Sequence, residues 1–166
     1  MRFPTLCLVV SMAAASPVLA QAPADDVAAI NTTLDQLHQF ASRPDGDAYF
    51  GLFTPSARFI GTDATERWSL AQFRAYAMPY FSQGKGWTYH PRERVVSILP
   101  IDCRCVASFD ERLDNAAYGE TRGSGVLVRT ADGWKIDQYV LSFAVPNDVA
   151  KAVVAVIAAP PAGEAP

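Results

Sequence analysis

Apolar residues recur at helical spacing in the first part of the chain. Between positions 25 and 43, Ile30, Leu34, Leu37 and Ala41 follow one another at steps of three or four residues. These steps are the period of one face of an α-helix. The pattern therefore predicts a helix over residues 25–43 with one buried face.

Two shorter helical segments are expected next. Residues 43–47 (RPDGD) break the first pattern, and the apolar residues from Tyr49 to Phe53 predict a short helix that ends before Pro55. Ser69 is a favourable N-cap with Gln72 three positions later, which is the spacing of a capping box, so a third helix is predicted to begin there.

The apolar pattern changes to alternation, the period of a β-strand, from Tyr89 onward. Four antiparallel strands are predicted over residues 89–99, 105–115, 121–130 and 134–143. Residues 147–158 predict a short C-terminal helix, and the Ala/Pro-rich residues 160–166 predict a disordered tail. Helices followed by a strand meander describe an α+β fold whose helices pack on one face of a curved sheet.

The first twenty residues have the layout of a secretory signal. Arg2 provides a positive start, residues 6–15 form an apolar run, and residues 18–20 (VLA) form a small-residue cleavage motif. The run is shorter than the ~20 apolar residues that span a bilayer. We therefore expect a mature chain from Gln21, with one domain over residues 21–150, that is periplasmic or secreted and no longer bound to a membrane.

The charge balance argues against polyanionic partners. The formal net charge is −3 over the 166 residues, and removal of Arg2 with the signal makes it more negative by one. The sequence has no cluster of Lys and Arg that would neutralise phosphates. We therefore expect neither nucleic acid nor an anionic lipid surface as a partner.

Two cysteines, Cys103 and Cys105, would remain in the mature chain. In an extended strand, residues i and i+2 have Cα atoms ~6–7 Å apart, at the upper edge of disulfide geometry, so a bridge requires a bend in the backbone. Metal binding is the alternative, but the pair supplies only two ligands, and His38 and His90 are the only histidines. Because four-ligand zinc spacing is absent, we expect no metal. We expect no organic cofactor either.

Three segments carry a resemblance to a known family: DGDAYFGLFTPSARFIGTDATERWSLAQFRAY, FDERLDNAAYGETRGSGVLVRT and DGWKIDQYVLSFAVPN. They resemble the SnoaL-like branch of the nuclear-transport-factor-2-like superfamily over residues 27–150. The resemblance implies a cone, in which a strongly bent sheet wraps around a long N-terminal helix and a pocket opens at the wide end. Members include ketosteroid isomerases, polyketide cyclases, epoxide hydrolases, dehydratases and proteins with no known catalysis, so membership alone does not give the function.

Strand alternation indicates which polar residues face the pocket. Glu111 shares a strand face with Phe109 and Leu113. On the next strand, Arg122 and Ser124 lie on the same face as Val126 and Val128. On the last strand, Gln138 lies on the same face as Ile136 and Val140. If these faces are concave, Glu111 and Arg122 meet in an apolar cavity. They are then either a structural ion pair, or a site in which Arg122 holds a ligand anion and Glu111 moves a proton.

A second group of candidates lies near the expected opening of the cone. Asp63, in the turn after Gly61, is either a turn former bonded to its own backbone or a catalytic base. Trp68, Tyr76 and Tyr80 are either core residues or aromatic walls for a ligand. Neither histidine has an identifiable partner acid, so a Ser-His-Asp site finds no support.

Three hypotheses follow for the function. In the first, the exported protein binds a small, mostly apolar molecule whose polar or anionic group meets Arg122, Ser124 and Gln138. In the second, it is a cofactor-independent isomerase, cyclase or hydrolase with Asp63 or Glu111 in acid/base chemistry. In the third, it is a non-catalytic homodimer that pairs through exposed apolar residues on the outer face of the sheet, namely Leu127, Tyr139, Leu141 and Phe143.

Overall fold

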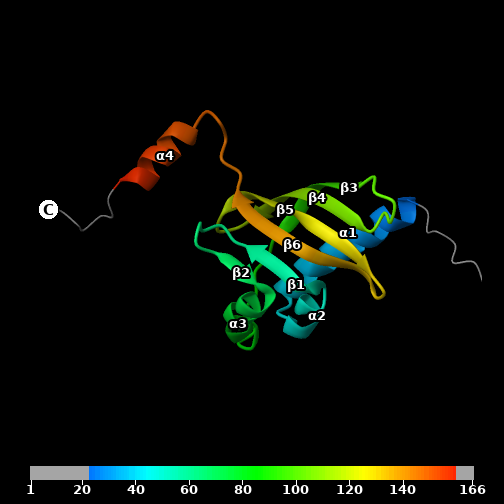
Figure 1. The fold of residues 1–166 in the computed structure, drawn as a ribbon. Coiled ribbons are helices and arrows are strands. Elements are labelled where there is room, and N and C mark those ends of the chain that lie inside the picture. The colour runs from blue at the N-terminus through cyan, green and yellow to red at the C-terminus, as the bar shows by residue number, and fades with distance from the viewer. Residues whose placement is uncertain (1–22, 160–166) are drawn as a thin grey trace, which may run out of the picture.

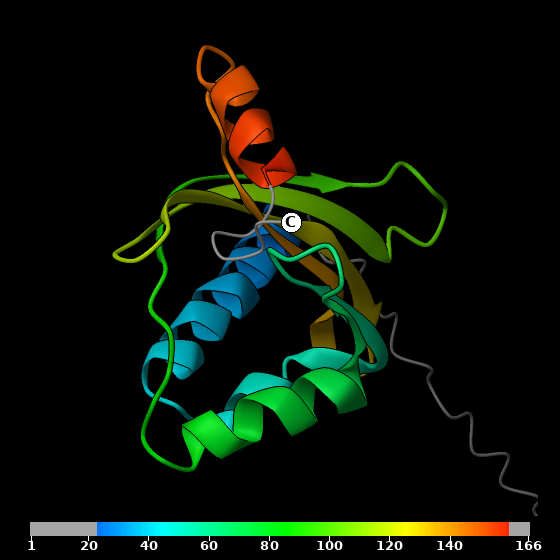
Figure 2. The same ribbon diagram turned by 90° about the vertical axis from the view of Figure 1, so that its left-hand side faces the viewer.

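A long N-terminal helix lies inside a strongly curved sheet in the computed structural model, which describes residues 23–159 (Figure 1 and Figure 2). Helix α1 (Pro23–Ser42) buries Ile30, Leu34, Leu37 and Ala41, each at most 3% exposed. The predicted helix and its buried face are thus confirmed. The α+β cone is confirmed as well.

Two short helices follow α1 and lie beneath the sheet in Figure 2. Helix α2 (Gly46–Phe50) begins and ends three residues earlier than predicted, because Asp45 caps it by accepting a hydrogen bond from Ala48 N. Helix α3 (Leu70–Phe81) begins as predicted, with Ser69 and Gln72 forming the capping box.

The sheet has six strands in the order β2-β1-β6-β5-β4-β3. Their bounds are β1 (Phe53–Ile60), β2 (Arg67–Ser69), β3 (His90–Ile98), β4 (Val106–Asn115), β5 (Gly119–Thr130) and β6 (Gly133–Phe143). Strands β3 to β6 confirm the predicted meander. The sequence did not indicate β2, nor that β1 lies parallel to β6 as an extension of the meander.

A bulge in β6 changes which of its residues face α1. Val126 of β5 pairs with Gln138, whereas the next residue, Leu127, pairs with Ile136, so Asp137 has no partner on β5. Asp137 instead accepts a hydrogen bond of 2.6 Å from the hydroxyl of Thr54. Beyond the bulge the inward positions of β6 are therefore odd-numbered rather than even-numbered.

The last helix, α4 (Ala150–Ala158), leads away from the sheet in Figure 1, and none of its residues is buried. It confirms the predicted C-terminal helix in shortened form. The proposed signal and the proposed tail lie outside the described residues. Within residues 23–159, no helix has the length and apolar character needed to cross a membrane.

Cys103 and Cys105 form a disulfide in the loop between β3 and β4. Their Cα atoms are 5.1 Å apart, closer than in an extended strand, because the backbone bends at Arg104, which has φ of 46°. The bend required by the sequence argument is thus present. Among the described residues, no group of three or more His, Cys, Asp or Glu gathers to hold a metal ion.

Candidate functional site

A cleft lined mainly by aromatic side chains opens between β1, β2, α3 and the segment that leads into β3. Its volume is about 160 Å³, close to the ~150 Å³ of an apolar cavity that holds a benzene ring. We call it the aromatic cleft, and its lining comprises Phe59, Gly61, Thr62, Glu66, Trp68, Phe73, Tyr76, Trp87, Tyr89, Tyr118 and Leu141. In size and in surface chemistry the cleft suits one flat, apolar ring.

Several of these rings are stacked on one another. The ring centroids of Phe59 and Phe73 are 3.9 Å apart, and Trp68 stacks on Phe73 at 5.8 Å and on Tyr76 at 4.8 Å. The Trp68–Phe73 contact also joins the residue before the α3 N-cap to the first turn of the helix. Because each ring is packed against another, one wall of the cleft is already formed before any ligand enters.

A smaller hollow borders the cleft on the side of α1. It has a volume of about 20 Å³ and shares Phe59, Trp87, Tyr89 and Leu141 with the cleft. We call it the inner hollow, and the rest of its lining comprises Leu37, His38, Ala41, Tyr49 and Tyr139. This volume suits one water molecule or one polar atom of a ligand.

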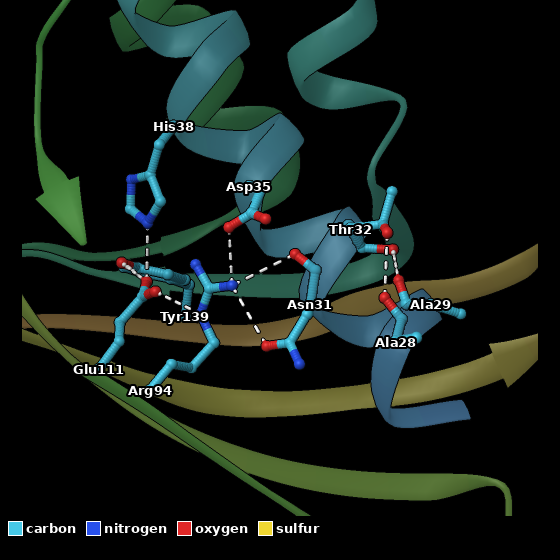
Figure 3. A network of polar contacts seen from close by, with 10 residues as sticks. Ala28, Ala29, Asn31, Thr32, Asp35, His38, Arg94, Glu111 and Tyr139 are labelled. Atoms are coloured by element: carbon cyan, nitrogen blue, oxygen red, sulfur yellow. Dashed lines mark hydrogen bonds and ion pairs between the residues drawn. The ribbon is translucent and has the colours of Figure 1, made fainter. Parts of the chain in front are cut away.

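A buried carboxylate lies behind the inner hollow. Glu111 on β4 is 0% exposed, and its Oε1 accepts hydrogen bonds from His38 Nε2 at 2.8 Å and from the Tyr139 hydroxyl at 2.9 Å. Its Oε2 accepts from Arg94 Nε at 2.8 Å, and Arg94 Nη1 donates to Asp35 Oδ1, also at 2.8 Å (Figure 3). The donors come from α1, β3 and β6, so the network ties the helix to the sheet.

This network keeps Glu111 ionised. Burial by itself would raise the pKa of the Glu111 carboxyl, but the hydrogen bond from His38, together with the charge and hydrogen bond of Arg94, outweighs it and holds the pKa below the ordinary glutamate range. An ionised carboxylate has no proton to donate, so both oxygens of Glu111 act only as acceptors.

Tyr89 and Tyr139 stay protonated, because for these two side chains burial is not outweighed. Burial raises the pKa of Tyr89 to about 12. Burial, reinforced by the negative charge of Glu111, raises the pKa of Tyr139 well above its usual value. Gly123 on β5 leaves the space that the Tyr139 hydroxyl occupies, because a Cβ at this position would collide with that oxygen.

A comparison with protein-family models assigns most of this fold to one family. The family model described as a SnoaL-like domain matches residues 30–146. The chain therefore belongs to the SnoaL-like family. No curated protein matches the chain.

Solved structures similar to this SnoaL-like domain share its fold at low identity. A candidate aromatic ring hydroxylase from Novosphingobium aromaticivorans has a TM-score of 0.62 and 20% identity, covering 76% of this chain and 94% of its own. A domain of unknown function with a cystatin-like fold from Nostoc punctiforme has a TM-score of 0.64 and 15% identity, and the match covers 84% of this chain and 90% of that domain. A candidate dehydratase of the nuclear-transport-factor-2-like family from Streptomyces avermitilis has a TM-score of 0.64 and 14% identity, and the match covers 75% of this chain and 100% of the dehydratase chain.

The predicted pairing of Glu111 with Arg122 is wrong. Glu111 faces α1 as predicted, but Gly123 is its partner on β5, and Arg122 is exposed on the opposite face. There Arg122 lines an open depression with Glu120 and Phe143. The partner of Glu111 is Arg94, so the structural ion pair exists with a different arginine.

Ser124 and Gln138 are also absent from the enclosed face. Thr121, Gly123 and Leu127 are the buried positions of β5, so its even-numbered residues, Ser124 included, point away from α1. Gln138 follows the bulge in β6 and is displaced from the inward row by it. The expectation that these side chains share the chamber with Glu111 is therefore wrong.

The candidates near the opening divide into two groups. Trp68 and Tyr76 line the aromatic cleft, whereas Tyr80 lies beside Tyr76 on α3 and outside that lining. Asp63 is exposed, and its Oδ1 accepts from the backbone N and the hydroxyl of Thr65 at 2.8 and 2.6 Å. These two hydrogen bonds lower the pKa of Asp63, and the bond from the Thr65 hydroxyl has the larger effect. They make Asp63 a turn former, which was the alternative to a base.

The apolar positions expected on the outer face lie mostly in the core. Leu127, Tyr139 and Leu141 are at most 9% exposed, and only Phe143 is half exposed, packed edge-on against Tyr118. The expectation of an exposed apolar patch formed by these four residues is wrong. The predicted homodimer therefore loses the surface on which it rested.

Proposed function

We propose that this SnoaL-like domain binds a small, flat, mostly apolar molecule in the aromatic cleft, with one polar substituent in the inner hollow. The observation that carries the proposal is the stacked aromatic wall of Phe59, Phe73, Trp68 and Tyr76 in a cleft of about 160 Å³. Flat rings gain both burial and stacking against such a wall. The candidate ring hydroxylase named above has a similar fold, which agrees with the proposal but does not carry it.

The charges of the site narrow this proposal. Glu66 is the only ionisable acid or base, apart from tyrosines, in the cleft lining, and Glu111 lies behind the inner hollow. Arg122, the expected anchor for an anionic group, is on the other face of the sheet. The site is therefore suited to a neutral molecule rather than to an anion.

Two tyrosines on α3 provide a matched test of the cleft. Tyr76 lines it and is 47% exposed, whereas Tyr80 is 46% exposed and lies outside the lining. With toluene as the probe, Tyr76→Ala should weaken binding about tenfold through the loss of one stacking and burial contact, while Tyr80→Ala should change it less than about twofold. Amide chemical-shift titration gives both dissociation constants. Equal losses, or no binding of toluene to the wild type, would contradict the proposal.

We further propose that the protein acts in the periplasm or as a secreted protein. The pattern of residues 1–20 supports export, and the Cys103–Cys105 disulfide is of a kind that persists in oxidising compartments. Expressed at full length in a Gram-negative host, the protein should be recovered from the periplasm with Gln21 as its first residue by intact-mass measurement. Replacing apolar Leu8 and Val9 by lysines should hold it inside the cell with Met1 or Arg2 as the first residue. A cytoplasmic wild-type protein of full length would refute this.

A further inference from the structure

The hydrogen bond between His38 and Glu111 fixes which nitrogen of the imidazole carries the proton. Because Glu111 is ionised and only accepts, the Nε2 of His38 must be the donor in their 2.8 Å contact. In the neutral imidazole, Nδ1 is then a bare acceptor. A carboxylate that holds a histidine in this way determines the chemistry of the other ring nitrogen.

The free nitrogen of His38 is accessible. Nδ1 makes no hydrogen bond to any residue between 23 and 159, and it is not among the fully buried nitrogen and oxygen atoms that lack a partner in that range. Figure 3 shows it on the side of the ring that faces away from Glu111 and Arg94. His38 contributes to the lining of the inner hollow.

The charges around His38 disfavour an anion in the hollow. Glu111 and Asp35 are negative and Arg94 is positive, so the network of these three is negative by one charge when the imidazole is neutral. Glu66 adds a negative charge at the cleft. The other polar side-chain groups of the hollow are the indole N–H of Trp87 and the hydroxyls of Tyr49, Tyr89 and Tyr139, and the Tyr139 hydroxyl is already donated to Glu111.

We propose that the ligand is a phenol, a neutral aromatic ring whose hydroxyl enters the inner hollow and donates its hydrogen to Nδ1 of His38. The inference rests on the proposed binding of a flat ring in the aromatic cleft and adds the identity of its polar group. The cleft of about 160 Å³ takes the ring, and the hollow of about 20 Å³ takes the single oxygen. An acceptor-only group such as a carboxylate would face the lone pair of Nδ1 and a network of net negative charge.

The test compares phenol with toluene, which has a methyl group in place of the hydroxyl, on the wild type and on His38→Phe. The phenylalanine keeps a planar ring and removes both nitrogens. At about pH 8, the ratio of the toluene Kd to the phenol Kd should fall about tenfold in the variant, or ~1.4 kcal/mol. Using the ratio cancels the different hydration of the two probes. His90→Phe, at the exposed start of β3, should leave the ratio unchanged.

The outcomes separate this inference from the proposed function. An unchanged ratio in His38→Phe, or benzoate binding more tightly than phenol, overturns the phenol assignment while toluene binding still supports the aromatic cleft. Failure of both toluene and phenol to bind the wild type overturns both proposals. If His38→Phe does not fold, the ¹⁵N resonance of Nδ1 in the wild type decides. Phenol, and not toluene, should shift it toward lower frequency, and an unmoved Nδ1 overturns the assignment.

Discussion

Arg94→Met should destabilise the fold more than any other single change at the site, by about 3–5 kcal/mol at neutral pH. Glu111 is 0% exposed and Arg94 is its only fully charged partner, with an Nε–Oε2 distance of 2.8 Å. Removing the guanidinium leaves a buried carboxylate with two hydrogen bonds and no permanent counter-charge. Urea unfolding followed by circular dichroism measures the loss in the free energy of unfolding.

A neighbouring arginine on the same strand supplies the control. Arg92 pairs with Asp114 at 3.1 Å, and both side chains are about half exposed. Arg92→Met should therefore cost less than about 1 kcal/mol. If Arg94→Met costs as little as Arg92→Met, Glu111 is not held as an anion in the fold and the account of the site fails.

The loss in the free energy of unfolding caused by Arg94→Met should also depend on pH. In the wild type the pKa of Glu111 is below the ordinary glutamate value of 4.5, so its ionisation stabilises the fold above that value and the contribution is lost as the pH falls through the lowered pKa. In the variant burial is no longer outweighed by Arg94, and the carboxyl can take up a proton at a higher pH. The stability difference between the two proteins should therefore shrink toward acid pH.

The fold was predictable where apolar residues mark a single face. Ile30, Leu34, Leu37 and Ala41 define α1, and the Ser69–Gln72 pair marks the start of α3. Alternation also placed Glu111 correctly, because its neighbours Phe109 and Leu113 are apolar and the outward residues of β4 are mainly polar. In each of these elements the local pattern and the tertiary packing agree.

The site was predictable only in part, because two strands give ambiguous patterns. The inward row of β5 contains Gly123 and Gly125, which have no side chain to mark a face, while Val126 and Val128 on the other face are half-buried and apolar. In β6 the bulge at Asp137 shifts the alternation by one residue. A bulge is stabilised by contacts distant in sequence, here with Thr54, and alternation within one strand does not reveal it.

His38 and Arg94 were missed although the sequence contained a signal for each. His38 is four residues after Leu34 and adjacent to Leu37, at the edge of the buried stripe of α1. Arg94 alternates with Val96 and Ile98, the partly buried positions of β3. Charged residues in apolar rows are the exceptions that indicate paired or functional groups. Applying the alternation argument to β3 as well as to β4 puts Arg94 on the inward face with Glu111, and the register of the two strands makes them partners.

Gly123→Ala should cost about 3 kcal/mol, because a methyl group enters the space of the Tyr139 hydroxyl and lies 2.9 Å from Glu111 Oε1. Two opposing effects decide whether Gly123→Ala raises or lowers the free energy of unfolding. Replacing glycine by alanine restricts the unfolded chain and stabilises by ~0.4–1 kcal/mol, whereas overpacking and the loss of a hydrogen bond to an ionised carboxylate each cost more. Ser124→Ala, the next residue on the outward face, should change the stability by less than about 1 kcal/mol.

Tyr139→Phe provides a rescue that identifies the cause. This change alone removes the 2.9 Å hydrogen bond to Glu111 and should cost about 2 kcal/mol. It also removes the atom that lies nearest to the added methyl group, although the ring Cζ of residue 139 and Glu111 Oε1, each 2.9 Å from the added Cβ, still have to shift. The double variant should therefore lose less stability than the sum of the two single losses, so that the two changes are non-additive in chemical denaturation. Additive costs would mean that Gly123 does not hold the place of the hydroxyl, and that the position of Tyr139 in the network has another origin.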